Sequence, residues 1–197
     1  MREWWLRTVL VLQAPRAVFA ALRDDSSEPA ANRSEPVLLI VLLAGVALAL
    51  WSRAASHLLD NGDYDGLLIA VWSFLAGGIT GIAAYWAFGA ILFGAGRAFG
   101  SRGSYRRARH VLAFASVPLA LSLALWPVRL ALYGEKAFRA GGVHAGHGVF
   151  SALWFLCAAW GAALLVVGVR TVHGWTWPRS GAAAVVPLAA AALLLTI

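Results

Sequence analysis

The chain has 197 residues, of which 61% are hydrophobic and only 13% charged, and its mean hydropathy is +0.74. A soluble domain carries about 25% charged residues, so this composition excludes an ordinary soluble fold and indicates an all-α integral membrane protein. The net charge of +7 does not indicate a nucleic-acid partner, because the basic residues lie between apolar runs and not on one soluble face.

Residues 1–36 form an N-terminal segment that precedes the first long apolar run. Its opening, MREWWLRTVLVLQAPRA, begins like a signal peptide. The apolar stretch is short and starts with paired tryptophans, however, so we expect it to be retained. The stretch APRAVFAALRDD predicts a short interfacial helix with Pro15 near its start, lying in the headgroup plane. Trp4, Trp5 and Phe19 are the candidate interfacial anchors, and RDDSSEPAANRSEP predicts a flexible polar linker.

Residues 37–197 form one predicted membrane domain with five transmembrane helices. The expected spans are 37–57, 67–96, 111–128, 149–169 and 181–197. The second has no charge over thirty residues. It corresponds to about 45 Å of helix, so it should tilt, bend or protrude near one of its glycine pairs. Pro118 and Pro127 predict kinks in the third span.

The orientation follows from the distribution of lysine and arginine, which cytoplasmic loops retain. Twelve of the 16 basic residues fall in the N-terminal segment and in the loops after the second and fourth spans. The expected topology therefore has a cytoplasmic N-terminus and an external C-terminus, in the cell membrane. The positions of four tryptophans agree, because an interfacial aromatic belt would place them near the outer span ends: Trp51, Trp72, Trp126 and Trp154.

Five arginines gather in and just before the stretch FGSRGSYRRARHVLAFASVP, with no acidic residue nearby: Arg97, Arg102, Arg106, Arg107 and Arg109. The simpler interpretation is that they determine topology. A second interpretation, compatible with the first, is that they form a docking site for anionic lipid headgroups or for a partner.

Two loops contain side chains that metals use. In DNGDYDG, Asp63 and Asp65 have the spacing of a calcium loop, but Trp72 stands where the bidentate glutamate would be. His144 and His147 are three residues apart, with no acid or cysteine to complete a site. We expect an acidic turn and solvated histidines, with neither a metal nor a cofactor.

The predicted spans carry little that chemistry could use. The chain has no HExxH, GxSxG or phosphate-loop motif, which argues against an enzyme. No ionisable residue lies in the middle of a span, which argues against an ion-coupled transporter. Gly77 and Gly81 have the spacing of a close helix contact, within one subunit in preference to a dimer face. The hydroxyls of the spans should bond to backbone and not line a path: Ser73, Thr80, Ser116, Ser122 and Ser151.

Several stretches resemble one known family. APRAVFAALRDD, with Pro15 and Phe19, is similar to that family's short helix before the membrane. FGSRGSYRRARHVLAFASVP, with Pro118, resembles its central loop, which the long second span enters directly. WFLCAAWGAALLVVGVRTVHGWTWPRSGAAAV resembles its last two spans. Over residues 15–197 the chain thus resembles the Ypt-interacting-protein (Yip) domain family of five-span membrane proteins.

The composition, rich in alanine, arginine and tryptophan, fits the bacterial branch of that family and a bacterial inner membrane. For this branch the resemblance implies a fold and leaves the function open. The link of eukaryotic members to Rab-type GTPases does not carry over, because the acidic-aromatic motif Asp-Leu-Tyr-Gly-Pro does not precede the first span. We therefore expect a non-enzymatic scaffold or accessory protein that contacts the bilayer, anionic lipids, other membrane proteins or further copies of itself. The alternative is a transporter or channel-like protein for a lipid or a small neutral molecule.

Overall fold

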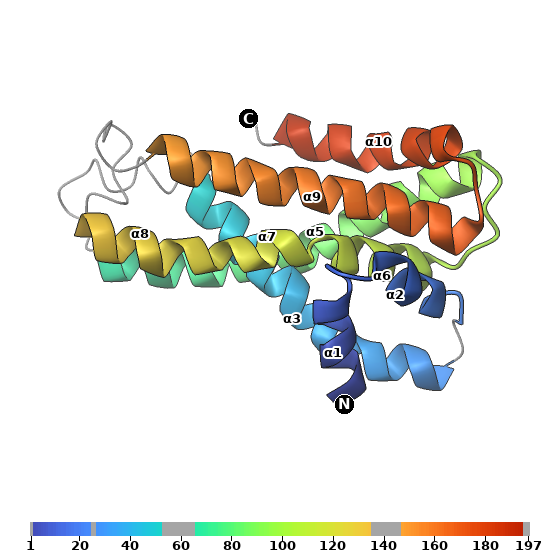
Figure 1. Ribbon diagram of the computed structural model, residues 1–197, viewed down its shortest axis with the longest axis horizontal. Coiled ribbons are helices and arrows are strands. Elements are labelled where there is room, and N and C mark those ends of the chain that lie inside the picture. Colours follow the sequence, from blue (N-terminus) through green and yellow to red (C-terminus); the bar gives the residue numbers. More distant parts are fainter. Residues whose placement is uncertain (1, 25–26, 53–65, 135–146, 195–197) are drawn as a thin grey trace.

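The computed structural model describes residues 2–24, 27–52, 66–134 and 147–194, and every regular element in these ranges is helical (Figure 1). Two short helices come first, α1 (Arg2–Leu10) and α2 (Pro15–Ala21). The long helices are α3 (Ser27–Trp51), α5 (Gly66–Ala98), α9 (His147–His173) and α10 (Trp177–Leu194). Between α5 and α9 the chain forms α6 (Tyr105–Ala115), α7 (Val117–Leu121), a 3-10 turn η1 (Ser122–Ala124) and α8 (Leu125–Tyr133).

Three helical segments within the described ranges are long and apolar enough to cross a membrane: Leu67–Ala98, Tyr105–Tyr133 and Gly148–His173. A shorter apolar helix covers Pro36–Trp51. The helix α10 has 18 residues and includes Arg179 and Pro187, and it is not among these segments. The fold is therefore that of a multi-pass membrane protein, and the described residues contain three segments of full crossing length where the sequence predicts five spans.

Proline explains the segmentation of Tyr105–Tyr133. Its missing N–H and its ring are tolerated in the first turn of a helix but disrupt a helix interior. Pro118 stands in the first turn of α7, and Pro127 stands in the first turn of α8, directly after the 3-10 turn. The kinks predicted at these two prolines correspond to the breaks between segments.

The start of the first long helix differs from the sequence-based expectation. The helix α3 begins at Ser27, so the flexible linker predicted up to residue 36 is wrong from residue 27 onward. Pro29 lies in the first turn of α3, where its missing N–H costs little. Pro36 lies inside α3 and is fully buried. The long second span is one continuous helix of 33 residues, about 50 Å in length.

Glycines bring α3 and α5 into close contact. A Cβ added to Gly45 on α3 would overlap the carbonyl oxygen of Gly77 and lie 2.5 Å from the Cα of Gly81. A Cβ added to Gly81 would overlap the carbonyl oxygen of Val41. The structure thus places Gly77 and Gly81 against a neighbouring helix, as their spacing predicts, with Gly45 as the third member of the contact.

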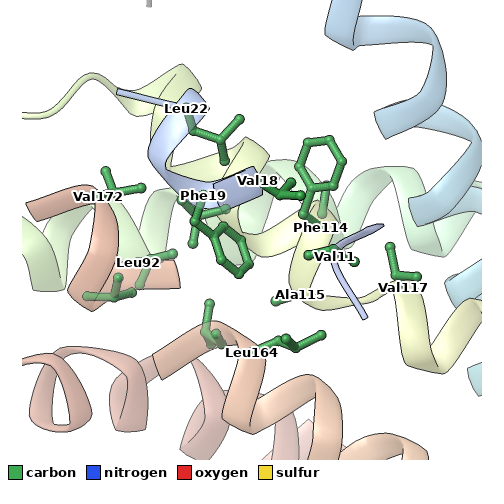
Figure 2. Packing of buried hydrophobic residues seen from close by; sticks show 14 of the residues in the cluster. Val11, Val18, Phe19, Leu22, Leu92, Phe114, Ala115, Val117, Leu164 and Val172 are labelled. Carbon is green, nitrogen blue, oxygen red and sulfur yellow. The ribbon is translucent and has the colours of Figure 1, made fainter. Parts of the chain in front are cut away.

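The main core lies where α2 docks between α6 and α9. Phe19 is fully buried, and Figure 2 shows its ring pointing from α2 toward Leu164 on α9. A Cβ on Gly168 would lie 2.9 Å from this ring, so α9 has a glycine where the aromatic ring needs room. The interfacial role predicted for Phe19 is wrong, because a side chain with no exposed surface cannot sit among lipid headgroups.

Candidate functional site at the arginine-rich end of the bundle

One end of the bundle collects most of the arginines of the described chain. At this end α5 and α9 finish, α6 and α10 begin, and α2 lies across α9 (Figure 1). We call it the arginine-rich end. Three groups of arginines lie at this end: those around residue 100 in the sequence, Arg23 after α2, and Arg170 and Arg179 beside the turn from α9 to α10.

A tight turn connects α5 to α6 at this end. Gly100 has a positive φ of 77°, and its N–H donates to the carbonyl of Arg97 at 2.9 Å. The N–H of Ser101 donates to the carbonyl of Gly96 at 2.8 Å, which completes a Schellman motif. Ser104 then caps α6, with its Oγ accepting from the N–H of Arg107 at 3.1 Å. Arg106, Arg107 and Arg109 therefore lie on a helix, whereas the sequence analysis placed them in a loop.

Positive side chains are unfavourable at a helix N-terminus, which carries a partial positive charge. Two of the arginines near the start of α6, Arg107 and Arg109, contact a carbonyl group and aromatic rings of other parts of the chain. Arg107 donates from Nη2 to the carbonyl oxygen of Arg23, just after α2, at 2.7 Å. Arg23 in turn donates from Nε to the carbonyl oxygen of Thr171, in the last turn of α9, at 3.0 Å.

The same kind of contact links α10 to α5. The guanidinium of Arg179 donates to the carbonyl oxygen of Phe99 at the end of α5 and lies 4.5 Å from the ring centroid of Trp175. The last carbonyl groups of a helix have no partner within the helix and carry a partial negative charge. Arg23, Arg107 and Arg179 thus satisfy carbonyl groups at or near the ends of three helices, which carboxylates could not do.

Arg109 is enclosed by aromatic rings. Its guanidinium carbon lies 3.7 Å from the centroid of Trp86, 4.7 Å from that of Tyr105 and 5.1 Å from that of Tyr85. A Cβ on Gly89 would overlap the methylene chain of Arg109, so this glycine of α5 makes the approach possible. Stacking of an arginine on aromatic faces is stabilising, more so where water is partly excluded. Arg109 is therefore a packing residue between α5 and α6.

The five arginines predicted to form one docking site divide into two groups. Arg97, Arg102 and Arg106 are exposed at the arginine-rich end. Arg107 and Arg109 are half-buried and held by protein groups. The structure thus brings all five to one end of the bundle but leaves three of them exposed there.

The opposite end of the bundle contains a feature that the sequence analysis missed. Arg129 is 3% exposed, and its guanidinium lies 5.4 Å from the ring of Trp51 and 5.0 Å from that of Trp126. Trp154 lies 6.0 Å from Trp51. Arg129 is therefore enclosed at this end of the bundle, where Trp51 packs against both Trp126 and Trp154. The sequence offered one indication of this cluster, because all three tryptophans stand near the outer ends of their predicted spans.

Other predicted candidates lie apart from this site or outside the described residues. Asp63, Asp65 and His144 fall outside those residues, as do the side chains of Trp4, Trp5 and His147. Within the ranges that the structure covers, no three His, Cys, Asp or Glu side chains come together as a metal site would require.

Three of the five predicted hydroxyls bond to backbone carbonyl groups three or four residues earlier in the chain. Thr80 donates to the carbonyl of Ala76 at 2.8 Å, Ser116 to that of Ala113 at 2.8 Å, and Ser122 to that of Leu119 at 2.6 Å. An apolar cavity lies between the helices, and Ser116 is the one member of the predicted five that lines it. The hydroxyls thus do not converge on this cavity.

The helical fold, its apolar crossing segments and the arginines gathered at one end define a multi-pass integral membrane protein. Within this class, the family model described as the Yip1 domain matches residues 9–197. The chain belongs to the Yip1 domain family. No significant match was found among curated proteins or among solved structures.

Proposed function

We propose that this protein is a non-enzymatic accessory or scaffold protein of a bacterial inner membrane, acting through contacts with lipids and with other membrane proteins. The observation that carries the proposal is the exposure of Arg97, Arg102 and Arg106 at the arginine-rich end. Exposed guanidinium groups beside a bilayer attract anionic headgroups and acidic partner surfaces. The absence of catalytic motifs from the sequence supports a non-enzymatic role.

The proposed topology has five spans, formed by α3, α5, the segment Tyr105–Tyr133, α9 and α10, with the arginine-rich end in the cytoplasm. The single cysteine, Cys157, allows a direct test. In a Cys157→Ser background, a membrane-impermeant maleimide should label an Ile197→Cys variant in intact cells. An Arg102→Cys variant should be labelled only after permeabilisation. Labelling of both variants in intact cells would refute five spans with this orientation.

The contact function is tested by crosslinking in native membranes. A photoreactive amino acid in place of Arg102, at the exposed turn, should form adducts with lipid or with one recurrent membrane protein. A photoreactive residue in place of Gly94, where an added side chain would meet open space on the apolar segment α5, serves as the matched control and should form adducts with lipid only. Identical adducts from both positions, or none from position 102, would contradict a contact function at the arginine-rich end.

Transport of a lipid or a small neutral molecule is the second candidate function. One observation favours it, the apolar cavity between the helices. We place it second because transporters usually present polar or ionisable groups at their midplane site. The lining of this cavity includes neither an acidic nor a basic side chain.

A further inference from the structure

A cavity of about 180 Å³ lies between the helices and is partly open at the bundle surface. Five helices contribute small residues to its wall, beside larger apolar side chains: Gly45 of α3, Gly81 of α5, Ala115 of α6, Ala158 and Ala162 of α9, and Ala191 of α10. Protein interiors normally contain few voids larger than one water molecule. A cavity of this size between closely packed helices therefore requires an explanation.

The chemistry of the wall favours an apolar occupant over a polar one. Two lining side chains carry a polar atom, Tyr85 and Ser116. The Ser116 hydroxyl already donates to the carbonyl of Ala113, at 2.8 Å. A polar solute would lose its hydration here and find at most these two hydroxyls as partners, which is unfavourable. Enclosed apolar cavities of about 150 Å³ stay dry and accept apolar molecules, and this partly open cavity has a similarly apolar wall.

The depth of the cavity identifies which apolar molecule is available. Its lining residues come from the central turns of the crossing segments, such as Gly81 and Tyr85 in Leu67–Ala98 and Ala158 and Ala162 in Gly148–His173. In a bilayer this level lies within the hydrocarbon core. There the acyl chains of phospholipids surround the protein at very high local concentration.

We infer that this cavity is a binding site for the acyl chain of a bilayer phospholipid, which enters from the surrounding membrane. The site is independent of the arginine-rich end, so it goes beyond the proposed scaffold function. It also restricts the alternative function, because any transported molecule that uses this cavity must present a hydrocarbon chain to it.

Neighbouring alanines on α9 provide a matched test. Ala158 and Ala162 line the cavity, whereas Ala159 and Ala163 are exposed on the outer face of the same helix and do not line it. The double variant Ala158→Leu/Ala162→Leu fills the cavity, and Ala159→Leu/Ala163→Leu adds the same atoms outside it. Each protein is purified in detergent, delipidated by extensive washing and examined by native mass spectrometry. Reconstitution with a phosphatidylglycerol of defined chain length then identifies the bound mass.

We expect the wild type and the outer-face variant to retain one phospholipid per protein. In the cavity-filling variant, the fraction of protein with a bound phospholipid should be at least tenfold lower. Retention of only a free fatty acid or detergent, or of no lipid by the wild type, would overturn the inference. Equal phospholipid retention by both double variants would also overturn it, because the lipid would then bind elsewhere. Should the double variant fail to fold, as judged by helical circular dichroism, the single Ala191→Leu variant tests the same site from α10, and unchanged retention there is equally decisive.

Discussion

Replacing Gly45 with alanine should destabilise the protein by about 3 kcal/mol, the upper part of the usual range for overpacking. The added methyl group meets the carbonyl oxygen of Gly77 and the backbone of Gly81, and backbone atoms cannot rotate aside as a side chain can. The helices α3 and α5 would have to separate along their whole contact. The free energy of unfolding in mixed micelles, followed by helical circular dichroism, measures this effect.

The matched control is Gly94→Ala on α5. An added methyl group there would meet nothing within 4 Å, and alanine favours a helix over glycine by up to about 1 kcal/mol. The two glycine-to-alanine changes should therefore shift the stability in opposite directions. If Gly45→Ala proved as stable as Gly94→Ala, the close approach of α3 to α5 would be wrong.

Replacing Arg97, Arg102 and Arg106 together with glutamine should weaken binding to anionic vesicles by more than a hundredfold. Each basic residue near an anionic surface contributes about 1 kcal/mol, so the three contribute up to roughly 3 kcal/mol, and 1.4 kcal/mol corresponds to a factor of ten. The measurement is vesicle co-sedimentation of the purified protein in neutral-lipid nanodiscs at low salt. Binding of the wild type should fall as the salt concentration rises.

The control retains the three charges as lysine and should bind like the wild type. Arg107 and Arg109 are left unchanged, because they hold α2 and α5 in place and their loss would change the fold. Unchanged vesicle binding by the glutamine variant would leave the exposed arginines without a lipid-binding role.

The sequence was informative where one residue determines the local structure. Pro15 begins α2, Pro118 and Pro127 lie at breaks of the third span, and Gly77 and Gly81 mark a close helix contact. In each case a missing N–H or a missing Cβ acts within one helix or at one contact. Such effects can be derived from the residue type alone.

The environment of amphipathic and basic side chains could not be predicted in this way. An apolar stripe beside arginines has the same pattern whether it faces lipid or protein, so the burial of Phe19 against Gly168 was not visible. The helical start of α6 was missed because no acidic residue follows Ser104 to mark a capping box. The enclosure of Arg109 depends on Trp86 and Gly89, about twenty positions away, meeting it on another helix.

The docking of α2 has a consequence for biosynthesis. Its site is built from α6 and α9, and the bond from Arg23 to the carbonyl of Thr171 joins residues 148 positions apart. At a synthesis rate of about 5 to 20 residues per second, roughly 7 to 30 s pass between translation of the two partners. During that interval α2 has been made, but the part of its docking site that α9 provides has not. The docking of α2 is therefore a late step in the folding of this chain, although α2 is made well before α9.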